Sequence, residues 1–521
     1  MAYLLGLDVG TTGAKALLTD ASGEVPAAAT AEYPIFTPQP LWSEQDPADW
    51  WRGSQAALRA VVAQAGIDTS AIAGLGLTGQ MHGSVFLDAQ GAVIRPALLW
   101  NDQRTAAECA EITYRVGETR LSEIAGNPAL TGFQAPKILW LRNHEPEQYA
   151  RVRRVLLPKD YIRYLLSGDF ATDASDAAGT LLLDLHTRDW SDEILERLHL
   201  PRDWFPQVYE GPEITGHLLP DVAAMLGLPA GLPIIAGGGD NAAAAVGTGV
   251  IREGMLSSSL GTSGVLFAHC DNLTLDPRGR LHTFCHAVPG KYHLMGVTLA
   301  AGGSFRWLRD LLGVSAIGSQ LAAIVGSMPE AGPQSGAPGF DELTAEAAQV
   351  PPGAEGLLFL PYLSGERTPH MDPLARGGFI GLTMRHKRAH LVRAIMEGVV
   401  YSLRDSLEIM RELGIPTNQI HVTGGGGRSP LWRQMQADIY GTAVAVPAVE
   451  EGPAYGAALL AGVGTGIFAD VAAACDTAVK TLTHTSPDAT RQSYYDACYQ
   501  TYHGLYATLR ETMHKLNALA Q

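Results

Sequence analysis

A chain of 521 residues is long enough for two large domains with separate hydrophobic cores. Its 46% hydrophobic and 17% charged residues are typical of a compact globular protein, and its formal net charge of −16 argues against a nucleic-acid partner, which requires a basic patch. No apolar run approaches the length of a membrane span, and the first residues lead into a predicted strand with no signal-peptide pattern.

The cysteines indicate a reducing compartment. There are five of them, an odd number, and no spacing between them is typical of a zinc site or a disulfide framework. We therefore expect reduced thiols and a cytoplasmic protein.

In chain order, apolar strands alternate with helical patterns, which predicts an α/β architecture. Strands are expected at residues 74–78, 155–157, 233–236, 293–295, 357–360 and 419–423, and helices at 47–64, 390–413 and 431–440. The Pro- and Gly-rich segment 328–356 indicates helix fragments and loop. Near the end, Tyr495, Tyr499, Tyr502 and Tyr506 recur at three- and four-residue steps, which predicts a helix packed across a second domain.

The same short turn occurs twice, half a chain length apart, each time between two predicted strands. The first copy is Gly10-Thr11-Thr12-Gly13 and the second is Gly261-Thr262-Ser263-Gly264. Glycines let a hairpin tip tighten and bring backbone N–H groups close to an anion, and the hydroxyls add donors. Either copy alone is explained by an ordinary hairpin. Together they predict a duplicated fold whose two tips hold the phosphates of ATP.

An acidic residue, Asp8, precedes the first turn at the end of an otherwise apolar strand. A carboxylate there is costly unless it has a partner or a function. The turn is not a P-loop, because no Gly-Lys-Ser/Thr follows at the required spacing. It is not a dinucleotide-binding fingerprint either, because a second strand follows instead of a helix.

The strongest candidate for chemistry is the run from Gly237 to Asn241, which contains three glycines and Asp240 between a buried strand and a small-residue helix. The glycines allow a substrate to approach the backbone. We expect the helix dipole to lower the pKa of Asp240 and keep it ionised. The alternative is a simple helix N-cap. A second glycine run, 423–429, also joins a strand to a helix and suits contact with a nucleotide, its alternative being a flexible loop.

Together these motifs resemble the FGGY family of carbohydrate kinases, from about residue 3 to about residue 466, with a further signature-like stretch at 378–397. The resemblance implies an α/β fold of two actin-like (ribonuclease H-like) domains of the actin/hexokinase/Hsp70 superfamily, with a cleft between them. It implies an N-terminal domain at 1–250 with the sugar site and first hairpin. A C-terminal domain at 251–466 would hold the second hairpin and the adenosine loop, and 467–521 would form a helical tail packed on it.

Within the family, segments 41–47, 79–83, 99–102, 157–161, 173–180 and 361–369 resemble the branch that phosphorylates D-xylulose. This implies ATP- and Mg²⁺-dependent transfer to its 5-hydroxyl in pentose catabolism, with a homodimer as the family-based expectation. A glycerol kinase is expected to carry an Arg-Glu pair where this chain has Gln80-Met81-His82. The alternatives are another FGGY kinase acting on ribulose, glycerol or gluconate, and a non-catalytic sugar-binding regulator.

The resemblance also implies roles for single residues. Asp240 would accept the proton of the sugar hydroxyl, and Asp8 would hold Mg²⁺, through water. Phosphoryl transfer depends on positioning and charge neutralisation, and Mg²⁺ retains several waters, so one carboxylate can suffice. The implied sugar contacts are Gln80, Met81, His82, Asp102 and Asn241. The implied nucleotide contacts are Thr11, Thr12, Lys15, Gly261, Thr262, Ser263, Gly424, Gly425 and Ser429.

Several of these residues have a plainer interpretation. The alternatives are a hydrogen-bonded core histidine for His82, core packing for Met81, a water-facing strand residue for Lys15, and a simple ion pair for Asp102 with Arg104. Trp42 and Trp100 either pack in the core or lie near the sugar.

Overall fold

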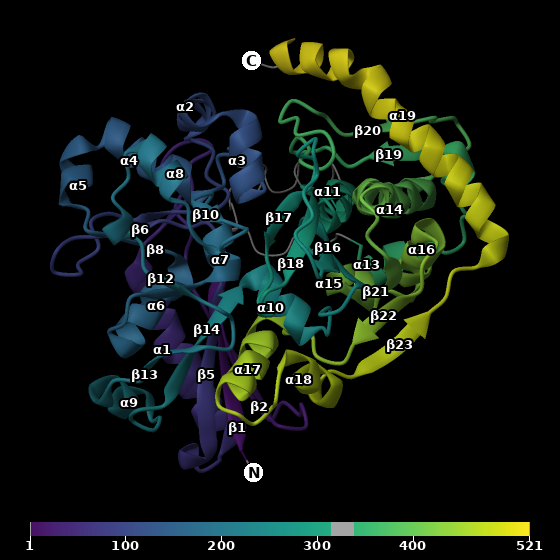
Figure 1. The fold of residues 1–521 in the computed structure, drawn as a ribbon. Helices are drawn as coiled ribbons and strands as arrows, with labels where there is room; N and C mark the ends of the chain where they lie inside the picture. Colours follow the sequence, from purple (N-terminus) through teal and green to yellow (C-terminus); the bar gives the residue numbers. More distant parts are fainter. Residues whose placement is uncertain (1, 314–337, 520–521) are drawn as a thin grey trace, which may run out of the picture. The chain divides into compact units, whose positions relative to one another are not determined.

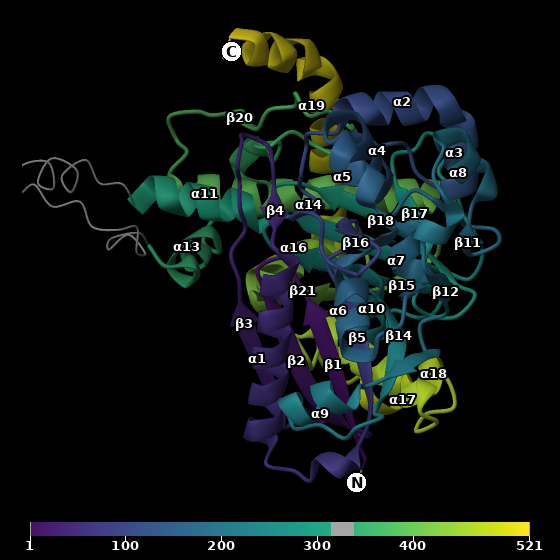
Figure 2. The same cartoon turned by 90° about the vertical axis from the view of Figure 1, so that its left-hand side faces the viewer.

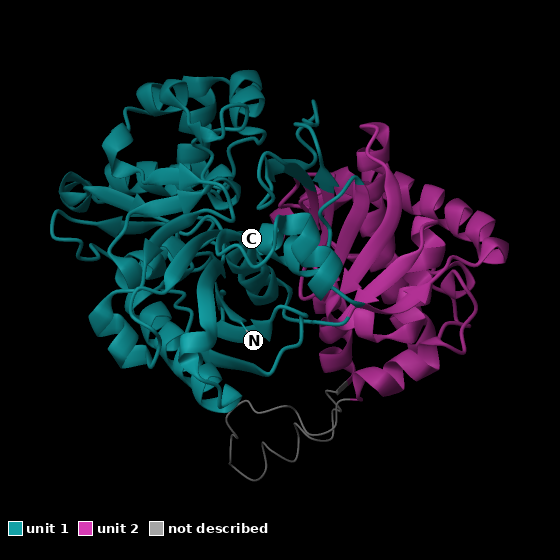
Figure 3. Ribbon diagram, turned by 60° about the horizontal axis from the view of Figure 1, so that its bottom comes forward, with its two compact units in different colours: residues 1–253, 269–294, 448–480 teal, residues 254–268, 295–447, 481–521 magenta. Residues whose placement is uncertain are grey.

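The computed structural model describes residues 2–313 and 338–519, which form two compact units (Figure 3). The first unit consists of residues 1–253, 269–294 and 448–480, and the second of residues 254–268, 295–447 and 481–521. The chain therefore returns to the first unit twice. The domain limits at residues 250 and 466 stay a prediction.

The first unit is built on a six-stranded sheet in which apolar strands β1 and β5 run parallel at the centre. The strand order is β13 (Ile214–His217), β14 (Pro233–Gly239), β5 (Ile72–Gly79), β1 (Tyr3–Val9), β2 (Gly13–Asp20) and β3 (Ala27–Glu32). Strand β14 is also parallel to β5, so the carboxyl ends of β1, β5 and β14 lie side by side. In α/β proteins, ligands bind at such an edge.

Helices cover this sheet, and one of them comes from the far end of the chain. Helix α1 (Pro47–Ala65) packs against β2 and β3, and α17 (Gly452–Gly464) packs against β1 and β5 (Figures 1 and 2). The close approach of α17 requires glycines in the strands. A Cβ on Gly6 would lie 1.9 Å from the carbonyl oxygen of Ala454, and one on Gly76 would lie 1.8 Å from that of Ala457. This contact explains why residues 448–480 belong to the first unit.

The remaining elements of the first unit surround the sheet. Its other helices are α2 (Ala106–Val116), α3 (Glu118–Ala125), α4 (Gln134–His144), α5 (Pro146–Arg151), α6 (Pro158–Ser167), α7 (Ala174–Ala178), α8 (Asp192–Leu198), α9 (Pro220–Leu226), α10 (Asp240–Gly247) and α18 (Val471–Ala478). Its short strands are β4 (Glu44–Gln45), β6 (Val85–Leu87), β7 (Ala97–Leu98), β8 (Arg154–Leu156), β9 (Ala171–Asp173), β10 (Leu183–Asp184), β11 (Asp189–Trp190) and β12 (Gln207–Tyr209).

A second sheet has seven strands. Their order is β17 (His282–Cys285), β18 (Tyr292–Thr298), β16 (Gly264–Cys270), β15 (Gly254–Leu260), β21 (Thr417–Thr423), β22 (Val444–Pro447) and β23 (Thr481–Thr485). Strand β17 lies in residues 269–294 of the first unit, whereas β15, β21, β22 and β23 lie in the second unit. The other elements of the second unit are α11 (Gly302–Gly313), α13 (Phe340–Ala347), β19 (Leu358–Leu360), β20 (Gly378–Ile380), α14 (Arg388–Glu412), α15 (Gly424–Arg428), α16 (Pro430–Tyr440) and α19 (Ala489–Leu519).

The long C-terminal helix α19 packs on the second unit through the predicted tyrosine face. Tyr495 and Tyr499 are buried and donate to carboxylates of α14, Tyr495 to Glu397 at 2.9 Å and Tyr499 to Asp405 at 2.8 Å. Figure 1 shows α19 in yellow beside α14 and α16. The helical face predicted from the tyrosine spacing is therefore confirmed.

The predicted strands and helices are all present, and their ends differ from the predicted ones by at most three residues. One glycine run differs from the expected loop, because residues 424–428 form the short helix α15. Of the segment 328–356, residues 328–337 lie outside the described residues, and the rest contains α13 and a short 3₁₀ helix, Ala354–Gly356. Among the helices described, none is long and apolar enough to cross a membrane.

Candidate active site

Three of the predicted residues follow from the parallel strands of the first sheet. Asp8 lies near the end of β1, Gln80 directly follows β5, and Asp240 directly follows β14. Register pairs Asp8 with Thr78, and Gly239 with Gly79. The two acidic residues therefore flank the end of the same central strand. The two carboxylates also interact electrostatically, since the charge of Asp240 contributes to the raised pKa of Asp8.

Asp240 is the first residue of α10, and Gly239 is the N-cap. Its Oδ1 accepts from the backbone N–H of Asn241 at 2.7 Å and from the Asn241 side-chain amide at 2.9 Å. The expected lowering of its pKa is wrong. Burial raises the pKa of Asp240 to about 6 and outweighs the two hydrogen bonds. A carboxylate with this pKa can accept a proton near neutral pH.

Asp8 has the properties of a carboxylate that can bind a cation. Its Oδ1 is buried and has no hydrogen-bond partner among the described residues. Burial first, and the Asp240 charge second, raise the pKa of Asp8 to about 7, while Lys15 on the neighbouring strand opposes the rise. No group of three or more His, Cys, Asp or Glu side chains in the described ranges could enclose a metal ion. A single carboxylate with an unused oxygen suits Mg²⁺, which retains water and binds phosphate oxygens.

The tip of the first hairpin is held from several sides. Tyr33 donates its hydroxyl to the carbonyl of Gly10 at 2.6 Å, and the side-chain amide of Gln45 donates to the carbonyl of Thr11 at 2.7 Å. The indole N–H of Trp100 donates to the Thr11 hydroxyl at 3.0 Å. Trp100 therefore supports this hairpin. Thr12 is exposed at the tip.

Gln80 belongs to the same support. Its side chain is 1% exposed, and its amide donates to Gln45 at 3.0 Å and to the carbonyl of Gly10 at 3.4 Å. Its Oε1 has no partner among the residues the structure describes. The observed contacts connect Gln80 to the hairpin, and its contact with a sugar stays a prediction.

Met81 lies directly beside the segment that carries Asp240, and His82 follows Met81 in the chain. A Cβ on Gly239 would lie 2.9 Å from Cγ of Met81, so the two are in contact. His82 has a positive φ of 68°, which is uncommon outside glycine. The His82 Nδ1 lies 2.5 Å from the carbonyl oxygen of Gly179. The Lys137 ammonium donates to the backbone carbonyl of His82 at 2.9 Å. The strained backbone is held by these contacts.

Asp102 and Lys15 are placed differently. Asp102 is buried, and both its oxygens accept from protein donors, namely Arg104 and the backbone N–H of Ser43. Arg104 in turn stacks on Trp42 at 3.5 Å, so the alternative of a structural ion pair accounts for the observed contacts. Lys15 is partly exposed, with its ammonium 3.9 Å from Glu451.

The predicted nucleotide residues of the second unit gather at the end of β15. Leu260, before the second hairpin, forms a bridge with Gly424, whose positive φ of 70° lets its backbone approach the Leu260 carbonyl. Thr262 and Gly425 are exposed. The Ser429 hydroxyl caps α16 by accepting from Trp432 at 3.3 Å.

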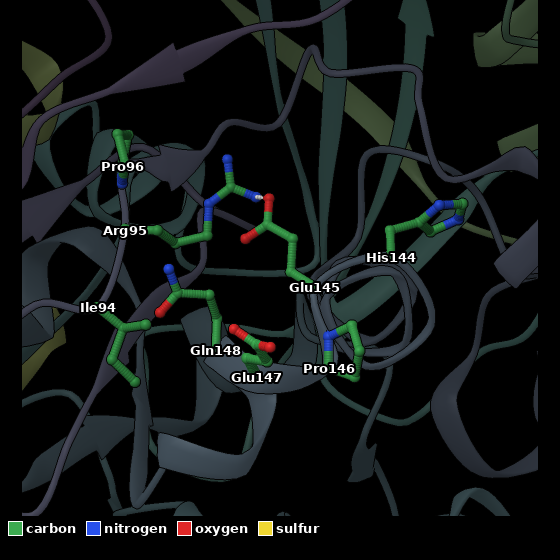
Figure 4. A pocket seen from close by; sticks show the side chains of 8 residues that line it. All are labelled: Ile94, Arg95, Pro96, His144, Glu145, Pro146, Glu147 and Gln148. Carbon is green, nitrogen blue, oxygen red and sulfur yellow. Dashed lines mark ion pairs between the residues drawn. The ribbon is translucent and has the colours of Figure 1, made fainter.

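The first unit also has a surface pocket (Figure 4). It is lined by residues 94–96 and 144–148 and contains none of the predicted site residues. Arg95 reaches into it and pairs with Glu145 at 3.1 Å and with Glu44 at 2.5 Å. Since the charge of Arg95 is already paired and none of the predicted site residues lines this pocket, we do not assign the chemistry to it.

A cluster of buried charges for which no role was predicted lies behind the site. Lys159 is fully buried and pairs with Asp160 at 2.6 Å and with Asp173 at 2.7 Å. A lysine two residues after the apolar predicted strand 155–157 is a signal in the sequence, because a buried charge requires partners.

Family models match both halves of the chain. The model described as "FGGY family of carbohydrate kinases, N-terminal domain" matches residues 3–247, and the C-terminal model matches residues 256–465. A xylulose kinase of Escherichia coli (strain K12) is 43% identical over 510 residues, which is 98% of this chain and 99% of that protein. A gluconokinase of Bacillus subtilis (strain 168) is 31% identical over 494 residues, covering 94% of this chain and 93% of the relative. The crystal structure of a "xyloylose kinase" from Brucella ovis superposes with a TM-score of 0.87 at 39% identity, covering 98% of this chain and 100% of the other.

Proposed function

The chain belongs to the FGGY family of carbohydrate kinases, and we propose that within this family it is a xylulokinase, which transfers the γ-phosphoryl group of ATP to D-xylulose and forms D-xylulose 5-phosphate. The observation that carries the reaction type is the pair Asp8 and Asp240, which flank one strand end beside Met81. Relatives named xylulose kinase support the choice of sugar. The predicted family and fold class are confirmed.

The residues of the chain divide the reaction between them. Asp240 accepts the proton of the 5-hydroxyl as its oxygen attacks the γ-phosphorus, and the bond to the β–γ bridging oxygen breaks to release ADP. Met81, His82 and Asn241 orient the sugar. Asp8 is the residue that would hold Mg²⁺, whose chemistry is the neutralisation of phosphate charge. The two hairpins and the Gly424 turn bind the nucleotide. We also propose a cytoplasmic enzyme that works in pentose catabolism and forms a homodimer.

A gluconate kinase is the second candidate, since the gluconokinase relative also matches most of the chain. A gluconate brings a carboxylate that requires Arg or Lys. None occurs in the segment 80–83, and the nearby Lys137 is engaged by the carbonyls of His82 and Gly132. This arrangement favours a neutral ketose over an acid.

A substrate panel tests the assignment. We expect kcat/KM for D-xylulose to exceed that for glycerol and for gluconate by at least roughly 10²-fold, because a short or charged substrate leaves buried polar groups unpaired. The two ribuloses should be discriminated less. The measurement is ADP release with each sugar at matched concentrations. Preference for gluconate, glycerol or an aldose contradicts the proposed sugar, and no turnover of any sugar favours a non-catalytic binder.

The pH dependence of turnover tests the proposed base. Burial raises the pKa of Asp240 to about 6, and a protonated carboxyl cannot accept the hydroxyl proton. At saturating Mg²⁺, whose charge favours the ionised form of Asp8, we therefore expect kcat/KM for the sugar to fall as the pH drops through about 6, approaching tenfold per pH unit well below it. The measurement is ADP release between pH 5 and pH 8 at constant ionic strength. A profile that stays flat to pH 5 contradicts the role of Asp240.

A further inference from the structure

A buried chain of polar contacts runs from Lys159 to the backbone of the residue before Asp240. Its members are Lys159, Asp173, Ser175 and Gly239, all within the first unit. The Lys159 ammonium pairs with one oxygen of Asp173 at 2.7 Å. The other oxygen of Asp173 accepts from the Ser175 hydroxyl at 2.5 Å and from its backbone N–H at 2.9 Å. All three side chains are at most 1% exposed.

The chemistry of the groups determines which one donates in each hydrogen bond between Asp173, Ser175 and Gly239. A serine hydroxyl has one hydrogen, and a carboxylate oxygen can only accept, so Ser175 donates to Asp173. The Ser175 oxygen is then free to accept, and the N–H of Gly239 donates to it at 3.1 Å. The paired charge of Asp173 strengthens this hydroxyl as an acceptor.

Gly239 is the place where the path of the backbone changes. It ends β14 and is the N-cap of α10, and the pairing of β14 with β5 is irregular just before it, between Ile235 and Gly238. At this point its N–H donates to a side chain, the Ser175 hydroxyl. The next residue is Asp240, so the hydrogen bond between Gly239 and Ser175 helps fix the backbone from which the Asp240 side chain projects.

Helix α7, which carries Ser175, also reaches the proposed sugar contacts. Gly179 follows α7, and its carbonyl oxygen lies 2.5 Å from Nδ1 of His82. A Cβ on Gly179 would lie 2.9 Å from the terminal methyl carbon of Met81. One short helix, anchored at its N-cap by Asp173 and Lys159, thus touches both the sugar-contact segment and the segment before the base.

We propose that Ser175 is a positioning residue for Asp240, held in place by Asp173 and Lys159. The proposal rests on the assignment of Asp240 as the base. A shift of about 1 Å in a reacting group can cost 10²-fold in rate, so the loss of one positioning bond should appear in turnover more than in sugar binding.

The test compares Ser175→Ala with Ser175→Cys. The alanine variant removes the acceptor and leaves a small void, whereas the cysteine variant fills the space with a weak acceptor. Both should lower kcat by about tenfold or more and change KM for D-xylulose by less than about threefold. Full recovery of kcat in Ser175→Cys would overturn the proposal, because it would show that only the packing matters.

A matched control is Ser191→Ala in the same unit. Ser191 is 5% exposed, and its hydroxyl accepts from the N–H of Ile194 at 3.3 Å, so the same substitution removes a similar bond whose partner is not next to Asp240. We expect this variant to lose some thermal stability and to keep its kcat. An equal loss of kcat in the control would overturn a specific role for Ser175.

A double-mutant cycle separates this proposal from the proposed function. In an Asp240→Asn background, Ser175→Ala should have little further effect on kcat, because the group that it positions no longer acts as a base. If the losses in kcat of the two single variants multiply in the double variant, Ser175 acts independently of Asp240 and the proposal is overturned. If Asp240→Asn keeps its kcat, the base itself is wrong. If only Ser175→Ala and Ser175→Cys keep theirs, the base stands and the positioning role fails.

Discussion

Replacing Asp240 with asparagine is expected to lower kcat by roughly 10²–10⁴-fold, the usual contribution of a positioned general base. Asparagine has nearly the same shape, and its side-chain oxygen can still accept from the backbone N–H of Asn241, which the carboxylate now binds at 2.7 Å. It cannot accept the hydroxyl proton. The fold and the affinity for D-xylulose, measured by calorimetry, should therefore change little, within about tenfold for affinity.

The control for this variant is Asp221→Asn, the same substitution at an exposed position in the first turn of α9. It should keep its kcat, since only a weak interaction with the helix dipole is lost. If Asp240→Asn turns over as fast as the parent enzyme, Asp240 is not the base. If it unfolds, the residue is structural, and circular dichroism recorded on the same sample distinguishes that case.

The second large effect is expected at Asp8. Asp8→Asn should lower kcat by at least about 10²-fold and raise the Mg²⁺ concentration needed for half-maximal activity, because the unused Oδ1 is the oxygen proposed to hold the ion. Sugar affinity without nucleotide should stay nearly unchanged. The measurements are ADP release across a Mg²⁺ titration, and calorimetry with the sugar alone.

We also expect the substitution of Asp8 to affect stability differently from the substitution of a structural residue. Its pKa is raised to about 7 in the folded chain, above its ordinary value of 3.8, so the charged form is disfavoured by folding. The stability associated with the protonated form is lost as the pH rises through about 7. At pH 8 the carboxylate therefore destabilises the fold, and Asp8→Asn should keep or raise Tm while it lowers kcat. A clear drop in Tm together with lost sugar binding would make Asp8 structural.

Much of the local design of the proposed site could be predicted from the sequence. Short-range chemistry is sufficient for a hairpin tip such as Gly10 to Gly13, or for the change from strand to helix at Gly239 and Asp240, because glycine and the apolar runs on either side determine the backbone path. An acidic residue on an apolar strand is visible without coordinates, since burying it has a cost that calls for a function. That is why both Asp8 and Asp240 could be selected before the structure was known.

Only the tertiary structure decided which partners these side chains meet. The pKa of Asp240 depends on burial, which the helix-dipole argument could not include, so its direction was predicted incorrectly. Gln80 connects to Gln45, and Ser175 to Gly239, across separations of 35 and 64 residues that no local pattern encodes. The packing of α17 on β1 likewise joins parts from the two ends of the chain. Local sequence determines the backbone of a turn, whereas desolvation and long-range hydrogen bonds depend on the whole fold.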